Sequence, residues 1–448
     1  MKKFGFFGRN NNKGEENHKQ MNDKVMTVRK KTAERPVSAD VGLPKKEMLK
    51  NLNSMKENHA KETKETKNES KNDNKEIKNT KNIKHEKDIE ELLRNSFLRP
   101  FLLDENITDI SYNGTTLWVQ NNKKGRYKPK EQPTHDEVYR LGKRIADIQG
   151  KEFTTNNPIL DTDLSYLRVN FMHDSISPSG CTFAIRVSKP RLVTADISSF
   201  ANKDVGKLLE ALIKAEKNII ISGRTGAGKT ELQKLLAGFI DDNKKITLME
   251  DTMDSHIKEL YPEKDINSWR TLTEDSREKK ITFHDLIKAG LRNNPDWMIV
   301  AETRGSESYS VLESALTDHA IITTLHATGA GAIPSRLISM IGQRYQVNEL
   351  LLGQDIVNTF RFGIYLTAEF TDKGIERYIR EIVEFTDFTE KGAKYTPIYQ
   401  VEMDYNEKTN EYKKVITTNP LSTRTVIELR NKKLIHLVPK VFLPKGGY

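Results

Sequence analysis

Apolar residues are spaced regularly over most of the chain but not over its first part. From Met1 to about residue 86, Lys, Asn and Glu predominate, and few aromatic or β-branched residues are available to form a core. Burying so few apolar side chains cannot offset the entropy that is lost when a backbone becomes ordered. The pattern therefore predicts a disordered arm over residues 1–87.

Helical and strand periodicities alternate in the next part of the chain. Apolar residues at helical spacing predict helices over residues 88–104 and 134–148. Alternation of apolar and polar residues predicts a β-hairpin around the turn pair Asn113-Gly114. The segments LSYLRVNFM and CTFAIRVS read as two further strands around a Ser-Pro-Ser-Gly turn. Together these elements predict a small α+β domain over residues 88–190.

The remaining residues repeat an apolar strand followed by a helix. The predicted strands are NIIISG, KITLMED, DWMIVAE and HAIITTLHA, and a long irregular stretch to Arg277 follows the second of them. Such alternation predicts an α/β fold with a parallel sheet between helices. After about Phe360, alternating segments indicate antiparallel strands. We therefore expect a nucleotide-binding domain with a β-rich C-terminal segment over residues 191–448.

A phosphate-binding motif follows the first of these strands directly and opens a helix. The segment GRTGAGKT satisfies G-x-x-x-x-G-K-[ST] in the strand–loop–helix context that this motif requires. Its backbone N–H groups are expected to bind phosphates at a helix N-terminus. Lys229 is expected to contact the β- and γ-phosphates of ATP, and Thr230 to ligate Mg²⁺. The predicted nucleotide contacts are Gly223, Arg224, Thr225, Gly226, Ala227, Gly228, Lys229 and Thr230.

Two more strands end in acidic residues. DWMIVAE ends in Glu302, and KITLM is followed by Glu250 and Asp251. Ligands of parallel α/β sheets bind at the carboxyl edge of the strands. Hydrolysis needs one carboxylate that positions water and another that supports the metal ion. We predict that Glu302 is the catalytic carboxylate and that Thr230, Glu250 and Glu302 form the metal site.

The strand HAIITTL ends in Thr324, Leu325 and His326. A histidine at this edge can sense the γ-phosphate or relay its loss to a neighbouring subunit. A lone histidine at a strand end equally serves a structural role. The residues alone leave both interpretations of His326 open.

The formal net charge is +10, and most of it belongs to the predicted arm. Residues 1–90 hold 23 Lys or Arg against 15 Asp or Glu, so the rest of the chain is nearly neutral. A nucleic-acid-binding domain would show a basic surface, so no direct binding of nucleic acid is expected. Phe4, Phe6 and Phe7 stand among basic residues, which leaves open a contact with an anionic membrane surface.

Cysteine content and apolar runs narrow the class of protein. The single cysteine, Cys181, excludes an internal disulfide framework and a four-cysteine zinc site. No apolar run approaches the roughly 20 residues that span a bilayer, and the first residues lack a long apolar segment with a cleavage site. We therefore expect a cytoplasmic protein of more than one domain, because 448 residues exceed what one core usually organises.

Four motifs in one order resemble those of the type II and type IV secretion ATPase superfamily, also called traffic ATPases. They are the phosphate loop GRTGAGKT, the acidic box LMEDTMD, the second nucleotide motif LRNNPDWMIVAETRG and the His box TTLHAT. Ahead of them, DENITDISYNG, NNPILDTDLSYLRVNFM and CTFAIRVSKP resemble the amino-terminal domain of the CpaF/TadA-like and conjugation-ATPase branch. The resemblance implies a RecA-like ATPase domain, a ring-shaped homohexamer, and ATP between the front and rear domains.

The resemblance also implies roles for individual residues. Glu250 and Glu302 match the family glutamates that serve hydrolysis. Arg168 and Arg186 match front-domain arginines that reach the phosphates, where they would stabilise negative charge; from the sequence alone, either is equally a surface charge on a strand. The other matching arginines of the nucleotide site are Arg270 and Arg304.

Several positions differ from the family pattern. Ala301 and Asp318 stand where glycine is usual, and Asp254 replaces the glutamate that ends the acidic box. The role of His319, which follows Asp318, is therefore left open. Arg224, Ala227 and Glu231 are also uncommon in the loop without removing a required group. The four-cysteine zinc module of some general-secretion ATPases is absent.

The function expected from this resemblance is a motor that couples ATP hydrolysis to protein secretion, pilus assembly or conjugative transfer. Its expected partner is an integral membrane platform protein, with peripheral association at the inner face of the cell membrane. Two alternatives remain from the sequence: a nucleic-acid translocase with the same ATPase core, and a scaffold that binds nucleotide without hydrolysing it.

Overall fold

The computed structural model describes residues 88–446, except positions 90, 165, 193–196, 273–279 and 372–373. All of these described residues fall in one compact unit, Asn79–Tyr448. The arm predicted over residues 1–87 lies outside the described residues. The domain boundary predicted near residue 190 stays a prediction, although two separate sheets lie on either side of it.

The first sheet has six antiparallel strands in the order β3-β2-β1-β6-β5-β4. Its strands are β1 (Ile107–Tyr112), β2 (Leu117–Asn121), β3 (Gly125–Tyr127), β4 (Ile159–Leu164), β5 (Leu167–Met172) and β6 (Thr182–Val187). The helices of this segment are α2 (Arg99–Leu103) and α3 (His135–Ile148). Thr134 caps α3, accepting a hydrogen bond from Glu137 N while the Glu137 side chain accepts one from Thr134 N.

Alternation along these strands separates an apolar face from a polar one. Val138 and Ile145 of α3 join the core formed by the apolar face, which includes Val119, Val169 and Phe171. The alternate residues of β1, β2, β5 and β6 are exposed or half-buried and include several charged and polar side chains. The period of two in the sequence thus places polar groups together on one face of the sheet.

The predicted hairpin and the helix ahead of residue 148 are confirmed, whereas three details of this segment were wrong. The predicted helix over 88–104 is interrupted by turn residues 95–98 before α2 begins. LSYLRVNFM is not one strand, because Leu164 ends β4 and Leu167 begins β5. Strands β3 and β4 were missed, since GRY is very short and ILDTDL buries only every second residue.

The second sheet has nine strands in the order β15-β14-β13-β12-β7-β11-β10-β8-β9. Strand β12 and the five strands that follow it in this order are parallel, and β12 to β15 are joined antiparallel. The bounds are β7 (Ile219–Gly223), β8 (Ile246–Glu250), β9 (Ile266–Arg270), β10 (Trp297–Val300), β11 (Ala320–Leu325), β12 (Phe362–Thr371), β13 (Gly374–Thr389), β14 (Gly392–Asn406) and β15 (Glu411–Thr418).

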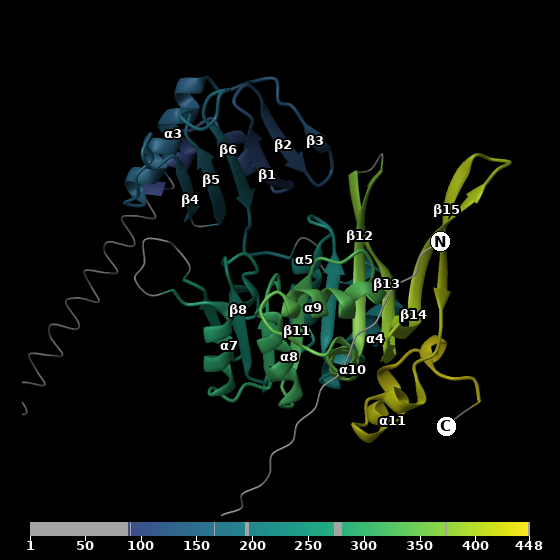
Figure 1. The fold of residues 1–448 in the computed structure, drawn as a ribbon. Helices are drawn as coiled ribbons and strands as arrows, with labels where there is room; N and C mark the ends of the chain where they lie inside the picture. The colour runs from purple at the N-terminus through teal and green to yellow at the C-terminus, as the bar shows by residue number, and fades with distance from the viewer. Residues whose placement is uncertain are drawn as a thin grey trace, which may run out of the picture. The chain divides into compact units, whose positions relative to one another are not determined.

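Helices cover both faces of this sheet, and Figure 1 labels all of them except α6. They are α4 (Lys203–Lys214), α5 (Lys229–Gly238), α6 (Ile257–Leu260), α7 (Phe283–Leu291), α8 (Ser308–Leu316), α9 (Ile333–Gly342), α10 (Glu349–Thr359) and α11 (Thr423–Asn431). Short 3₁₀ turns lie at η1 (Ile197–Ser199), η2 (Ala330–Ala332), η3 (Ile435–Leu437) and η4 (Lys440–Phe442).

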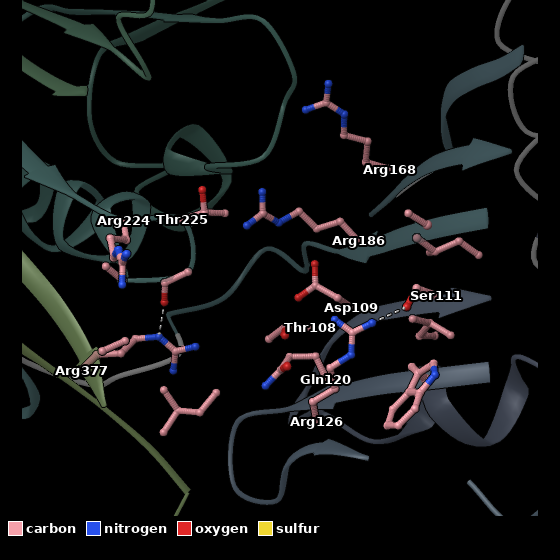
Figure 2. A pocket seen from close by; sticks show the side chains of 18 of the residues that line it. Thr108, Asp109, Ser111, Gln120, Arg126, Arg168, Arg186, Arg224, Thr225 and Arg377 are labelled. Atoms are coloured by element: carbon pink, nitrogen blue, oxygen red, sulfur yellow. Dashed lines mark hydrogen bonds between the residues drawn. The ribbon is translucent and has the colours of Figure 1, made fainter. Parts of the chain in front are cut away.

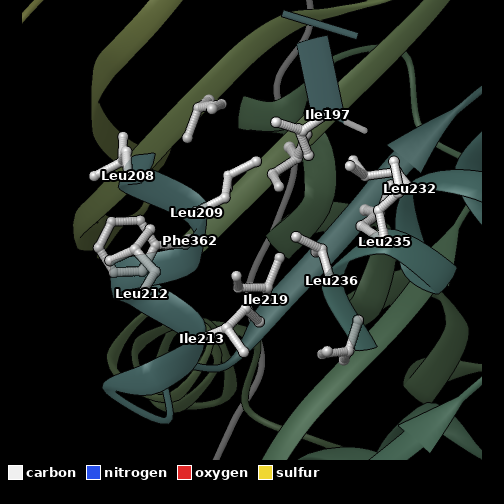
Figure 3. Packing of buried hydrophobic residues seen from close by; sticks show 14 of the residues in the cluster. Ile197, Leu208, Leu209, Leu212, Ile213, Ile219, Leu232, Leu235, Leu236 and Phe362 are labelled. Carbon is white, nitrogen blue, oxygen red and sulfur yellow. The ribbon is translucent and has the colours of Figure 1, made fainter. Parts of the chain in front are cut away.

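Alternate residues of the central strands enter two different cores. Ile219 and Ile221 of β7 pack with α4, α5 and α11, whereas Ile220 packs with α7 to α10. Figure 3 shows the first core around Ile219, with side chains of α4, α5 and β12 gathered there: Leu208, Leu209, Leu212, Leu232, Leu235, Leu236 and Phe362. Each large apolar side chain buried in this way contributes roughly 1.5–3 kcal/mol. The two cores fix β7, and therefore the loop that follows it, relative to its neighbours.

The predicted parallel sheet and the antiparallel strands of the tail are confirmed. The stretch to Arg277 is less irregular than predicted, because it contains α6 and the edge strand β9. Strand β9 (INSWR) has few apolar residues and was missed for that reason. Helices α4, α9, α10 and α11 were also missed. No element was predicted for the segments that form the first three, and the strand-like alternation of the tail dominated the interpretation around α11.

The C-terminal helix α11 is attached to the sheet by a buried carboxylate. Glu384 of β13 is 1% exposed and accepts hydrogen bonds from Ser422 N at 2.8 Å and Ser422 Oγ at 2.6 Å. The Thr425 hydroxyl donates a further hydrogen bond to the same carboxylate. On the same helix, Glu428 pairs with Arg361 Nη1 at 3.1 Å and with Lys217.

Among the described helices, none combines the length and apolar character needed to cross a bilayer.

Candidate active site

The loop between β7 and α5 depends on glycine at three positions. Gly226 and Gly228 have φ of 77° and 96°, in the left-handed region that other residues adopt at a cost. A Cβ on Gly223 would lie 2.6 Å from the carbonyl oxygen of Leu366, which is closer than such atoms pack. These three positions explain why the loop motif places glycines there.

Lys229 lies at the first turn of α5 and is 8% exposed. Its Nζ donates to the carbonyl oxygens of Gly223 at 3.1 Å and Arg224 at 3.3 Å, and lies 3.4 Å from His326 Nδ1. Burial lowers the pKa of Lys229 to about 8, although the negative charge of Glu302 acts in the opposite direction. A desolvated ammonium group of this kind gains strongly from an anionic partner, such as a phosphate.

Glu302 follows β10 and is surrounded by cationic groups. Arg304 Nη2 donates to Glu302 Oε2 at 2.7 Å, and His326 Nε2 lies 3.0 Å from Glu302 Oε1 without the alignment of a hydrogen bond. Burial raises the pKa of Glu302, but the hydrogen bond and charge of Arg304, together with the charge of Lys229, lower it further than burial raises it. Glu302 is therefore an ionised carboxylate at neutral pH.

Glu250 ends β8 in a different setting. Its side chain is 1% exposed, Oε1 accepts a hydrogen bond from Ser255 N at 3.0 Å, and Oε2 is buried without a hydrogen-bond partner. Burial raises the pKa of Glu250 to about 7, against the hydrogen bonds from Ser255. A buried carboxylate oxygen without a hydrogen-bond partner is suited to accept a hydrogen bond from a water molecule or to serve as a ligand of Mg²⁺.

His326 comes from the end of β11 and joins these groups. Its Nδ1 lies 3.0 Å from the carbonyl oxygen of Gly223, while Nε2 faces Glu302. Arg304 links Glu302 to Asp251 through Nη1 at 2.9 Å. The ends of β7, β8, β10 and β11 therefore bring together Lys229, Asp251, Glu302, Arg304 and His326, as parallel strand order requires.

Two predicted arginines lie on the polar face of the six-stranded sheet. Arg168 of β5 and Arg186 of β6 are direct register partners. Both line a cavity of about 840 Å³ together with the loop residues Arg224 and Thr225. Figure 2 shows Arg186 extending toward Thr225 of the loop, with Arg168 on the adjacent strand. The structure thus brings Arg168 and Arg186 to the loop, and their action on phosphates stays a prediction.

Other predicted residues are placed farther from the loop. Arg270 is the register partner of Glu250 on β9, and its Nη1 lies 3.5 Å from Asp163 Oδ2. His319 precedes β11 and lies 3.1 Å from Thr317 Oγ1, at the strand end opposite His326. The structure therefore does not bring His319 to the loop.

Residues 159–360 match the family model "Type II/IV secretion system protein". An uncharacterized protein of Bacillus anthracis is 33% identical over 363 residues, which cover 79% of each chain. This chain belongs to the type II/type IV secretion ATPase superfamily. It also resembles a putative conjugal transfer protein of Mycobacterium tuberculosis, with 25% identity over 55% of this chain and 73% of that protein.

One solved structure similar to this chain is the ATPase DotB of Legionella pneumophila. The two are 23% identical, the TM-score is 0.48, and the match covers 64% of this chain and 78% of that chain. The sheet topology, and not this likeness, confirms the predicted fold class of this secretion ATPase: an α/β domain with a parallel sheet follows a smaller α+β segment. The protein is a nucleotide-binding ATPase, as the sequence predicted.

One residue at the phosphate loop of this secretion ATPase could not be recognised from the sequence. Arg377, on β13, donates from Nε to the carbonyl oxygen of Gly226 at 2.8 Å and lines the same cavity as Arg186. Within GIERYIREIVEF it is one of several charged residues of an alternating strand. Nothing in the sequence distinguishes Arg377 from the other charged residues of this strand, because the residue that it contacts, Gly226, lies 151 positions away.

Proposed function

We propose that this secretion ATPase is a cytoplasmic motor that couples ATP hydrolysis to protein secretion, pilus assembly or conjugative transfer through a membrane machine. The observation that carries the proposal is the grouping of Lys229, Glu302 and His326 around one phosphate loop. The loop supplies phosphate binding and the carboxylate supplies a proton acceptor. The name of the Mycobacterium relative, a putative conjugal transfer protein, supports transfer through a membrane.

In the proposed reaction, loop N–H groups and Lys229 bind the phosphates of ATP. Glu302 orients a water molecule and accepts its proton as the water oxygen bonds to the γ-phosphorus. The bond from that phosphorus to the ADP oxygen breaks, which leaves ADP and inorganic phosphate. Arg304 and Lys229 keep Glu302 ionised for this role, because they stabilise its negative charge.

The donor groups present fit a magnesium ion. Thr230, Glu250 and Glu302 would hold it, and the partnerless Oε2 of Glu250 is the observation that favours such a ligand. Within the described residues, no cluster of three or more His, Cys, Asp or Glu side chains could hold a metal alone. Mg²⁺ is commonly bound by one or two protein carboxylates together with oxygens of the substrate phosphates. When bound, it would neutralise charge on the β- and γ-phosphates.

Arg168 and Arg186 are proposed to stabilise the charge that develops on the γ-phosphate. Both are cations on the polar sheet face, and both line the cavity beside Thr225. Arg270, which is half-exposed on β9, is proposed to approach nucleotide only in the assembled ring. His326 is proposed to report the state of the γ-phosphate, since it contacts both the Gly223 carbonyl and Glu302.

The assembly is proposed to be a homohexamer at the inner face of the cell membrane, with an integral membrane platform protein as partner. A front domain over 88–190 and a rear domain over 191–448 would hold ATP between them. One cavity is lined by Arg186 of the first segment and by Lys229 and Glu302 of the second, which supports the placement of ATP between them. Direct nucleic-acid binding is not part of the proposal.

Steady-state ATP hydrolysis by the purified full chain tests this function, with and without DNA. The parent should turn over regardless of DNA, and Lys229→Ala should abolish turnover because it removes the phosphate-binding ammonium group. The exposed Glu313 of α8 offers a control, since Glu313→Gln should leave the rate unchanged. Turnover that requires DNA would favour a nucleic-acid translocase, and a folded parent without turnover would favour a nucleotide-binding scaffold.

A further inference from the structure

Strand β13 runs along the outer side of the phosphate loop. Arg377 Nε donates to the carbonyl oxygen of Gly226 at 2.8 Å. A Cβ on Gly228 would lie 3.2 Å from Arg377 Cδ and 3.0 Å from the Phe200 ring. The loop is therefore packed against Arg377 and Phe200 as well as bonded to Arg377.

Phe200 is attached to the same strand. Its carbonyl oxygen accepts a hydrogen bond from Ile379 N at 2.8 Å, and its side chain is 2% exposed. Arg377 and Ile379 are two residues apart on β13, so they lie on the same side of the strand. Arg377 and Phe200, the two residues that contact the loop here, are thus both held by β13 of the nine-stranded sheet.

The contact with Gly226 has a direct consequence for the shape of the loop. The Gly226 carbonyl belongs to the same peptide group as Ala227 N–H, which donates to the Arg224 carbonyl oxygen at 3.2 Å. A cationic donor on a carbonyl oxygen polarises its peptide group and makes the N–H a stronger donor. The contact with Arg377 therefore strengthens the Ala227–Arg224 hydrogen bond, which closes a turn within the loop.

Arginine suits this place better than another cation. Its guanidinium is planar and permanently charged, so the donor direction is fixed by the plane of the group. Figure 2 shows Arg377 extending from its strand toward the loop segment of Arg224 and Thr225. Burial lowers the pKa of Arg377, while the charges of Glu231 and Asp109 act in the opposite direction.

We propose that Arg377 is a positioning residue for nucleotide binding: its hydrogen bond to Gly226 holds the phosphate loop in the shape that presents its N–H groups to a triphosphate. The inference rests on the proposed function in so far as nucleotide binds at this loop. It adds a residue outside the four sequence motifs to the binding machinery.

The test is equilibrium binding of ADP and of a non-hydrolysable ATP analogue to the full chain by fluorescence titration. Arg377→Met keeps an apolar stem against Gly228 but removes the donor and the charge. It should raise Kd for both nucleotides about tenfold, and Arg377→Lys, which keeps a donor, about threefold. The exposed Arg380 of the same strand is the matched control, and Arg380→Met should leave Kd unchanged.

Thermal unfolding without nucleotide and the split between KM and kcat separate positioning from a structural role. If Arg377 positions the loop, the KM of Arg377→Met rises while kcat and the apo melting temperature change little. A lower melting temperature with an unchanged Kd would overturn the proposal, as would an Arg377→Met protein that binds as the parent does. Binding is measured without turnover, so a parent that binds nucleotide but hydrolyses none would refute the proposed function and leave this test valid.

Discussion

The ends of β8 and β10 carry the same kind of residue in opposite surroundings. Glu250 is buried, one of its carboxylate oxygens has no hydrogen-bond partner, and burial raises its pKa to about 7. Glu302 is also partly buried, yet Arg304 and Lys229 lower its pKa below the ordinary value. Sequence pattern made the two strand ends equivalent, and the neighbouring charges make them different.

The difference indicates a division of work. Pairs of carboxylates whose surroundings push their pKa values apart commonly take different roles in one site. Glu302, which stays ionised, suits the acceptance of a proton from water. Glu250, which has one buried oxygen without a hydrogen-bond partner, suits the support of a metal ion.

Glu302→Gln keeps the size of the side chain and removes its charge. We expect kcat for ATP hydrolysis to fall about 100- to 1000-fold, because a general base of this kind contributes on that order. Nucleotide affinity should stay within about twofold, since Lys229 and the loop are unchanged. Single-turnover hydrolysis and equilibrium binding measure the two quantities, and a loss in kcat below tenfold would contradict the role of Glu302.

Glu250→Gln should reduce the rate less and change its dependence on Mg²⁺. The amide can still accept the hydrogen bond from Ser255 N, but it is a weaker ligand for a hard cation. We expect kcat to fall about tenfold and the Mg²⁺ concentration for half-maximal rate to rise by a similar factor. Rates measured across a Mg²⁺ series give both values. An unchanged Mg²⁺ requirement would remove Glu250 from the metal site.

Glu428 of α11 adds a third carboxylate to the comparison. It pairs with Lys217, which lies shortly before β7, and with Arg361, which directly precedes β12. These contacts lie at the strand starts, whereas Glu250 and Glu302 lie at strand ends. Burial raises the pKa of Glu428, but Lys217 and Arg361 more than offset this and hold it at about 2. Its contribution to stability is therefore fully present above the ordinary pKa of 4.5 and is lost as pH falls toward 2.

Glu428→Gln should lower the free energy of unfolding by about 1 kcal/mol at pH 7, after solvent screening of a partly exposed group is allowed for. The difference from the parent should shrink by pH 3.5, while kcat stays unchanged at pH 7. Urea unfolding at the two pH values measures this. Exposed Glu407 is the control position, and a parallel loss for Glu407→Gln would show that charge alone, without the pairing, is responsible.

Arg304→Gln weakens the cationic setting of Glu302 and gives the smallest expected effect. The Arg304 side chain is 56% exposed, so solvent screens its charge. We expect kcat to fall about threefold, and the pKa seen in the pH–rate profile for Glu302 to rise toward its ordinary value. A pH–rate profile from pH 4.5 to 8 records the shift; no change in its acidic limb would mean that Lys229 alone sets the ionisation of Glu302.

The sequence was sufficient for the phosphate loop and for the sheet edge beside it. Glycines at Gly226 and Gly228 require unusual backbone angles, and each apolar run had to be a buried strand, so the ends of β7, β8, β10 and β11 followed. The grouping of Lys229, Glu302 and His326 was therefore predictable from local rules alone.

Contacts made by distant segments could not be predicted. Strand β9 has too few apolar residues to be recognised, and α11 follows strands whose alternation hid it. Arg377 reaches Gly226 only because β12 and β13 extend the sheet beside β7. The contrasting pKa values of Glu250 and Glu302 likewise arise from neighbours that spacing along the chain does not reveal.

The buried carboxylate of Glu384 limits how far the chain can be shortened from its C-terminal end. Removal of residues from Ser422 onward would take away all three of its hydrogen-bond donors, together with the core side chains of Val426, Leu429 and Phe442. Each large apolar side chain lost from a core costs roughly 1.5–3 kcal/mol, and together they are a large share of the stability of a typical domain. The last segment is thus an integral part of the ATPase fold, and tags or fusions belong after it rather than in its place.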